Sequence, residues 1–344
     1  MTRAIRPSTP ADAPAIIALL REAGLSSNVE PEHLQWKYWQ ERHDWSGSRS
    51  FVLTEDNEVI AHGAIIPAWC LWNSQRIRLI HVIDWAARPS ALGAGAILMR
   101  YFGAQAQALL AIGGSEQTLK ILPRMGFRPA GSATGYVRPL HSLRLLRGVT
   151  QPSWRLLLRV ARSAAWALAA PRGRHADWQV RRIGLDDVGQ IAHAVPKSDY
   201  GMSVLERTTE AFRYMLNTPI VQMHLHAMER AGVIRGYFLL AAAPGQVRIA
   251  DCWMDSRDSS DWGDMIQCAV AQAKHDPQAA EIVIQASDAL LTEALRACGF
   301  HARGATPVQI RMAPGIATPP APLRVQMLDN DAAYLHEGRR EFWA

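Results

Sequence analysis

The 344-residue chain is poor in features that would place it in several large classes of protein. Its four cysteines are scattered and form no C-x-x-C pair, which argues against a disulfide framework or a zinc site and favours a reducing, cytoplasmic compartment. It has no uncharged apolar run of about 18 residues, so no membrane-spanning helix is expected. Asp12 interrupts the first apolar stretch, which therefore predicts a strand and a helix and not a secretory signal.

Acidic residues are absent from one long segment. Between Arg138 and Arg174 the chain has eight arginines and no Asp or Glu. These eight outnumber the net charge of +6, so the basicity belongs to this segment and not to the chain as a whole. They are Arg138, Arg144, Arg147, Arg155, Arg159, Arg162, Arg172 and Arg174.

The same segment predicts one helix, WRLLLRVARSAAWALAA, with Ser153 as its N-cap. Helical periodicity places its arginines on one face, opposite Leu157, Val160 and Ala164. Two interpretations remain open: a linker helix packed on the domains with its arginines in water, or a helix at an anionic membrane surface through 153–169. Binding to nucleic acid is not expected, because the segment has no basic face studded with aromatic residues.

The chain does contain a repeat of itself, at an offset of about 170 residues. Five landmarks recur in one order: a strand and helix, an aromatic-cation-Tyr helix, a hairpin, an Asp followed by Trp, and a G-F pair. The matched segments are 4–20 with 179–194, 34–39 with 211–216, 51–66 with 224–240, Asp84-Trp85 with Asp251-Cys252-Trp253, and 123–131 with 296–304.

This repeat and the length predict two domains. The expected divisions are a first copy at 1–137, an Arg-rich helical linker at 138–176, a second copy at 177–314 and a C-terminal tail at 315–344.

The order of these landmarks resembles the GCN5-related N-acetyltransferase superfamily, and Trp36-Lys37-Tyr38 resembles its bacterial members with a W-K/R-Y helix before the hairpin. The resemblance implies an α/β (α+β) fold of two tandem domains, each with a mixed, mostly antiparallel sheet flanked by helices. It also implies acetyl-CoA, or another acyl-CoA, as the co-substrate, with no metal.

The family holds the pyrophosphate of coenzyme A at a Gly-rich turn that opens a helix, where backbone N–H groups are free. The matching segment is ARPSALGAGAILMRYF, in which Leu92 and Ile97 depart from the family's basic and small residues. The expected coenzyme-binding residues are Trp85, Ala86, Leu92, Gly93, Ala94, Gly95, Ala96 and Ile97. In the second copy the equivalent turn carries Asp255, Asp258, Asp261 and Asp264, which would repel a pyrophosphate, so we expect that copy to be degenerate.

Acyl transfer needs a base, an oxyanion donor and an acid for the leaving thiolate. The resemblance makes Asp84 the first candidate base, although its recurrence as Asp251 also fits a structural carboxylate paired with Arg78 or Arg88. Glu116 is the second candidate, and a helix-capping role would explain it equally. Leu122 replaces the Tyr that often serves as the acid.

Trp36, Lys37 and Tyr38 are the expected acceptor contacts, although adjacent helix positions cannot all face one way, so some must be core. The sequence therefore predicts an N-acyltransferase acting on a small-molecule or peptide amine by direct transfer. The alternative is an inactive protein of the same fold that binds a partner or a membrane through its Arg-rich segment.

Overall fold

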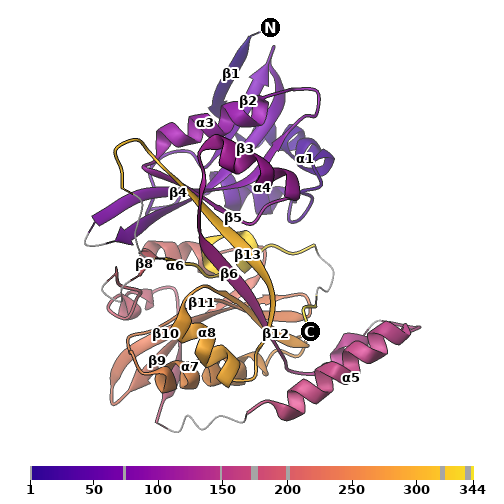
Figure 1. The fold of residues 1–344 in the computed structure, drawn as a ribbon, viewed down its shortest axis with the longest axis vertical. Coiled ribbons are helices and arrows are strands. Elements are labelled where there is room, and N and C mark those ends of the chain that lie inside the picture. Colours follow the sequence, from indigo (N-terminus) through magenta and orange to yellow (C-terminus); the bar gives the residue numbers. More distant parts are fainter. Residues whose placement is uncertain are drawn as a thin grey trace. The chain divides into compact units, whose positions relative to one another are not determined.

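A computed structural model describes residues 2–72, 75–147, 149–171, 177–198, 202–317, 322–337 and 342–344. Arg172 and Arg174 of the predicted basic segment therefore lie outside the described residues. The chain divides into two compact units (Figure 1). The first comprises 1–132, 197–206 and 307–323, and the second comprises 133–196, 207–306 and 324–344.

The strands of the first unit lie in the order β1-β2-β3-β4-β5-β13. All neighbours are antiparallel except β4 and β5, which are parallel. The strands are β1 (Arg3–Pro7), β2 (Ser50–Glu55), β3 (Glu58–Trp72), β4 (Gln75–Ala87), β5 (Ala108–Ile112) and β13 (His301–Met312). The short β8 (Ser203–Leu205) pairs with β3.

Helices cover both faces of this sheet because its strands alternate between two apolar faces. Val52 packs with Ile16 and Leu20 of α1 (Ala13–Glu22), whereas the next residue, Leu53, packs with Phe102 of α3 (Ala94–Gln105). The other helices of this unit are α2 (Pro31–Leu34), which continues into a π-helical turn (Gln35–Trp39), and α4 (Glu116–Ile121).

The second unit repeats this strand order as β7-β9-β10-β11-β12-β6. Here β11 and β12 form the parallel pair. The strands are β7 (Gln179–Ile183), β9 (Gln222–Arg230), β10 (Val233–Ala243), β11 (Gln246–Met254), β12 (Glu281–Ala286) and β6 (Arg128–Pro139). The helices are α5 (Trp154–Ala169), α6 (Thr209–Leu216), α7 (Ser259–Ala273) and α8 (Ala289–Ala297), and the two-residue β14 (Leu323–Arg324) follows β13. The predicted fold class, a mixed and mostly antiparallel sheet flanked by helices, is confirmed.

Each unit takes its last strand from the other half of the sequence. Val308–Met312 of β13 pair with β5 in the first unit. Thr134–Pro139 of β6 pair with β12 in the second. Both strands follow a left-handed glycine, Gly126 or Gly299, in the two G-F pairs that the repeat identified. Neither unit is therefore one continuous stretch, and the divisions expected from the repeat stay a prediction.

A bulge interrupts the pairing of β3 with β4. His62 pairs with Ala86 and Ala64 with Ile83, so Gly63 alone lies opposite Asp84 and Trp85. Asp84 has a φ of 48°, which a short polar residue tolerates better than most. A Cβ on Gly63 would lie 2.8 Å from the ring of Phe102, which is fully buried. The bulge therefore requires glycine on β3.

Replacing Gly63 with alanine should lower the free energy of unfolding by about 1–3 kcal/mol, because the buried Phe102 ring cannot move aside. The measurement is the midpoint of urea unfolding. Gly184→Ala is the control, since no atom lies within 4 Å of its added Cβ, and it should change little. Equal midpoints for the two variants would contradict this account of the bulge.

Candidate functional site

The candidate site of the first unit begins where β4 and β5 separate. The parallel pairing joins only Leu79 to Ala108, Ile80 to Leu109 and His81 to Leu110. His81 Nδ1 lies 2.9 Å from the carbonyl oxygen of Leu110 and closes this end of the ladder. From Val82 to Ala87, β4 makes no pairing with β5 among the residues that the structure describes. The two strands therefore separate toward the end of β4, before the turn that leads to α3, and we call this separation the opening.

The turn after β4 ends in a helix with free backbone donors. Gly93 is the N-cap of α3 and has a φ of 78°, as expected for the glycine of a tight turn. In the described part of the chain, the N–H groups of Leu92, Gly93, Gly95 and Ala96 meet no backbone acceptor. Free N–H groups at a helix N-terminus favour a phosphate or another anion.

The side chains of this turn leave the donors accessible. Leu92 is 84% exposed, and Ile97 packs against the core cluster beneath α3. The side chain of Ile97 is therefore directed toward the core and not toward the N–H groups of the turn. Ala94 is fully buried, so it anchors the turn.

Trp85 and Ala86 follow the bulge on opposite faces of β4. The indole N–H of Trp85 donates to the carbonyl oxygen of Gly95 at 3.0 Å, and a Cβ on Gly95 would lie 3.1 Å from the ring. Gly95 is thus required for the packing of Trp85 as well as for the turn. Ala86 is buried in the cluster under α1.

Asp84 lies at the centre of a buried ion pair. Lys37 Nζ lies 2.6 Å from Asp84 Oδ2, and the two side chains are 1% and 8% exposed. The hydroxyl of Tyr38 donates to the same oxygen at 2.7 Å. Burial alone would raise the pKa of Asp84, but the charge of Lys37 and these hydrogen bonds outweigh it and hold the pKa below its ordinary value.

Neither arginine expected beside Asp84 is its partner. Arg78 stacks over the ring of Trp45 at 4.1 Å, and Arg88 pairs with Glu58 at 2.6 Å. Periodicity could not identify Lys37, because its approach depends on the π-helical turn Gln35–Trp39, in which Gln40 N–H donates to the Gln35 carbonyl oxygen. The guanidinium of Arg49 holds this turn by donating to the carbonyl oxygens of Trp36, Lys37 and Gln40.

A series of hydrogen bonds, all donated in the same direction, ends at the backbone of Asp84. Sequence patterns did not indicate it, because its members resemble ordinary core residues. His62 Nδ1 donates to the carbonyl oxygen of Asp84 at 3.0 Å, so its Nε2 accepts from the Ser50 hydroxyl at 2.9 Å. Ser50 then accepts from Ser8 at 2.6 Å, and Ser8 accepts from the indole of Trp39 at 3.0 Å. Burial lowers the pKa of His62 to about 4, which keeps this imidazole neutral.

A cavity of about 380 Å³ lies beside the Trp39 end of this series of hydrogen bonds. Its walls come from the π-helical turn and the loop that follows it. They include Ser8, Tyr38, Trp39, Trp45 and Ser50. Of the three residues expected on the acceptor side, only Tyr38 lines this cavity, whereas Trp36 is buried in the core and Lys37 pairs with Asp84.

Two further residues have surroundings that limit their chemistry. Glu116 is exposed on the first turn of α4 and pairs with Lys120 at 2.5 Å, and no contact joins it to Asp84 among the described residues. Leu122 is buried in the core beneath α3. No acid for a leaving thiolate is present at the Leu122 position.

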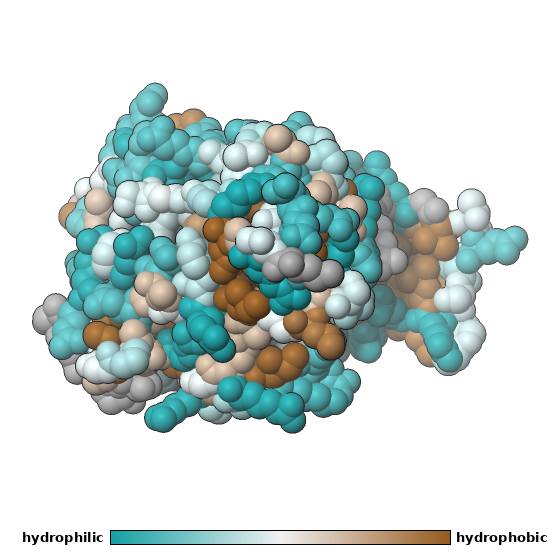
Figure 2. Space-filling model, turned by 90° about the horizontal axis from the view of Figure 1, so that it is seen from above, coloured by the Kyte–Doolittle hydropathy of each residue, from teal (hydrophilic) through white to brown (hydrophobic). Residues whose placement is uncertain are grey.

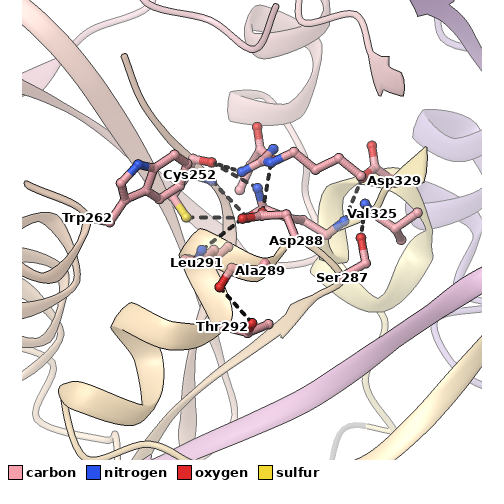
Figure 3. A network of polar contacts seen from close by, with 12 residues as sticks. Cys252, Trp262, Ser287, Asp288, Ala289, Leu291, Thr292, Val325 and Asp329 are labelled. Atoms are coloured by element: carbon pink, nitrogen blue, oxygen red, sulfur yellow. Dashed lines mark hydrogen bonds and ion pairs between the residues drawn. The ribbon is translucent and has the colours of Figure 1, made fainter. Parts of the chain in front are cut away.

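The equivalent opening of the second unit is filled by its own chain. β11 and β12 pair only from Gln246 to Arg248, and beyond this point a bridge joins Ala286 to Gln326. The side-chain amide of Gln326 accepts from Cys252 N–H at 3.1 Å and donates to the Cys252 carbonyl oxygen at 2.9 Å. Figure 3 shows this network, with Cys252 on one side and Val325 and Asp329 on the other. The segment 324–329 therefore closes the second opening.

The acidic turn of the second unit is also occupied by internal contacts. Asp258 caps α7 by accepting from Ser260 N–H at 2.9 Å, and Asp261 pairs with Arg230 at 3.0 Å. Asp251 lies where Asp84 does in the first unit, fully buried and bonded to Arg207 at 2.8 Å and to the Tyr237 hydroxyl at 2.5 Å.

No model of a known protein family matches the sequence, and no curated protein shows a significant similarity to it. Solved structures do match. A GCN5-related N-acetyltransferase from Anabaena variabilis is 14% identical, with a TM-score of 0.61 over 90% of this chain and 73% of its own. A probable N-acyltransferase from Enterococcus faecalis is 11% identical, with a TM-score of 0.61 over 91% and 72%.

A eukaryotic structure matches to the same extent. N-myristoyltransferase from Saccharomyces cerevisiae, with bound myristoyl-CoA and inhibitors, is 14% identical, with a TM-score of 0.62 over 99% of this chain and 86% of its own. Identities this low establish the fold and not the activity. The resemblance in fold predicted from the sequence is confirmed: this chain has the fold of the GCN5-related N-acetyltransferases.

Proposed function

We propose that the first unit binds an acyl-CoA, acetyl-CoA in the first instance, and transfers its acyl group to an amine. The observation that carries this proposal is the opening between β4 and β5, which leads to four free N–H groups at the start of α3. A pantetheine arm between the strands and a pyrophosphate on the turn would satisfy these backbone groups. The neighbours named as acyltransferases, one with bound myristoyl-CoA, support the same class of co-substrate.

We place the acceptor amine in the cavity lined by Trp39 and Trp45, beside Tyr38. The structural role of Asp84 gains support from its ion pair with Lys37, since a carboxylate whose pKa is lowered is a poor proton acceptor. Glu116 stays the second candidate base, with its side chain in water. Because Leu122 offers no proton, the thiolate would leave unassisted and take a proton from water.

The second unit, in this proposal, is a degenerate copy that binds no coenzyme. Its opening holds Gln326, whose amide makes the two backbone contacts with Cys252 that a bound amide ligand would make. Its turn is lined with carboxylates that already have partners. One chain should therefore bind one acyl-CoA.

Acetyl-CoA at 1 mM should raise the unfolding free energy by about 4 kcal/mol if the dissociation constant is micromolar. Thermal shift with acetyl-CoA, myristoyl-CoA and free coenzyme A measures this, and calorimetry should give one site per chain. An inactive binding protein of the same fold would give no shift with any of the three, and this result would exclude the enzyme. Two sites per chain would instead refute the degenerate copy.

A charge at position 92 should change the affinity for acetyl-CoA without changing the fold, because the Leu92 side chain is 84% exposed. Leu92→Glu should weaken acetyl-CoA binding about five- to tenfold through repulsion of the phosphates. Leu92→Lys, the matched control, should bind at least as tightly as the native chain. Calorimetry at low ionic strength compares the three proteins, and equal affinities would place the phosphates away from the α3 turn.

Asp84→Asn should lower the unfolding free energy by about 3–5 kcal/mol, because it leaves the Lys37 ammonium buried without its counter-ion. Asparagine tolerates the left-handed φ at this position, so backbone strain is not introduced. Adding Lys37→Met should recover much of the loss. If Asp84 were a catalytic base with no structural role, Asp84→Asn would instead lose activity and keep the urea midpoint of the native chain.

The same ion pair predicts a pH dependence. The pKa of Asp84 is lower in the folded chain than the value of about 3.9 in the unfolded one, so its stabilising contribution is complete above about pH 4. The contribution is lost as the pH falls through the lowered folded value. Stability of the native chain should therefore fall more steeply below pH 4 than that of Asp84→Asn.

A further inference from the structure

The helix α5 of the Arg-rich segment has a third face that the sequence did not reveal. Its inner face is apolar: Val160 and Leu156 pack with Leu145 and Ala280, and the Ser163 hydroxyl donates to Ser142 at 2.9 Å. These contacts fix how the helix lies against its own unit. Val160 is buried as predicted, but Leu157, expected on the same packed face, is 49% exposed.

A second face carries the arginines, which are exposed as predicted. The guanidinium of Arg162 lies 5.1 Å from the centre of the Trp166 ring. The same ring stacks on His301 at 3.8 Å and lies 4.7 Å from the guanidinium of Arg303. Arg155 lies over Trp154 at 5.6 Å. The arginines therefore flank the helix and do not cover its outermost surface.

The outermost face is apolar and exposed. The exposed fractions are 65% for Trp154, 49% for Leu157, 59% for Leu158 and 82% for Leu168. Spacings of three, four and seven or more residues bring them, with Ala161 and Ala165, onto one side of the helix. Figure 1 shows α5 projecting from the strands of its own unit, and Figure 2 shows apolar surface on this projecting part, at the right.

A continuous exposed apolar face marks a docking surface more often than chance exposure does. The charges that α5 itself contributes are of a single sign, since 139–171 contains no Asp or Glu, and Glu281, the carboxylate that interacts with Arg159, is fully buried. A second copy docked on the same face would bring arginine against arginine, which disfavours self-association. A surface of anionic lipid has the complementary charge and an apolar layer behind it.

We propose that α5 lies in the plane of an anionic membrane surface, with Trp154, Leu157, Leu158 and Leu168 between the head groups and Arg155 and Arg162 on lipid phosphates. Tryptophan and leucine on one side with arginine beside them suit this boundary. The helix does not cross the bilayer: no helix in the described ranges is long and apolar enough to do so. This proposal is independent of acyl-CoA binding.

The test is sedimentation of the full chain with vesicles of phosphatidylcholine alone or mixed with phosphatidylglycerol. The native chain should partition onto the mixed vesicles, weakly onto the neutral ones, and less as salt rises. Leu158→Glu and Leu168→Glu together should reduce partitioning about tenfold or more. Val233→Glu, a similarly exposed apolar residue elsewhere in this unit, should leave it unchanged.

Circular dichroism and the midpoint of urea unfolding confirm that each variant is folded. Failure to bind the mixed vesicles would overturn the proposal. Equal loss in the Val233→Glu control would place the contact elsewhere and would overturn it too. Light scattering tests the remaining outcome, self-association. A native dimer that the two α5 substitutions abolish, in a chain that does not bind vesicles, would overturn the proposal and show that this face binds a second copy.

Discussion

Two parallel strands that separate leave backbone N–H and C=O groups facing each other without partners, and this constraint organises both units. Buried backbone groups must be paired, so each opening has to be filled. The second unit fills its opening with a segment of its own chain, in which the side-chain amide of Gln326 hydrogen-bonds to Cys252 of β11 and a β-bridge joins Gln326 to Ala286 of β12. The first unit has no such segment among its described residues, which leaves its opening to a ligand. The proposed difference between the units, coenzyme binding in the first and none in the second, rests on this difference in what fills the opening.

The central carboxylate has the same kinds of partner in both units. Asp84 is buried beside Lys37 and Tyr38, and Asp251 is buried beside Arg207 and Tyr237. Both units thus have a buried carboxylate near the end of the equivalent strand, paired with a cation and a tyrosine. This arrangement is a feature of the architecture and not of one active site. This shared arrangement explains why the residue first considered as a catalytic base recurs in the second unit as a buried, paired carboxylate.

The sequence predicted what depends on local pattern and on repetition. The strands, the main helices, the Gly93 turn and the paired landmarks follow from periodicity and from the offset of about 170 residues. It could not predict contacts created by topology. The approach of Lys37 to Asp84 depends on a π-helical turn, and the neutral chain from Trp39 to His62 depends on strand register. Leu157 of α5 was expected on the packed face because apolar periodicity does not indicate which apolar face is covered.

The exchanged strands β6 and β13 set the order in which the protein can be completed during its synthesis. The first 132 residues contain nearly all of the first unit, yet β5, which pairs with β4 on one side, gains a neighbour on its other side only when Val308–Met312 have left the ribosome. Until then the apolar strand ALLAI is an open sheet edge, which is a site of misassociation in a nascent chain. Expressing the two halves separately would leave that edge unpaired permanently, and the second half alone would lack the strand that borders β12. The two halves of this chain therefore depend on each other to complete their sheets.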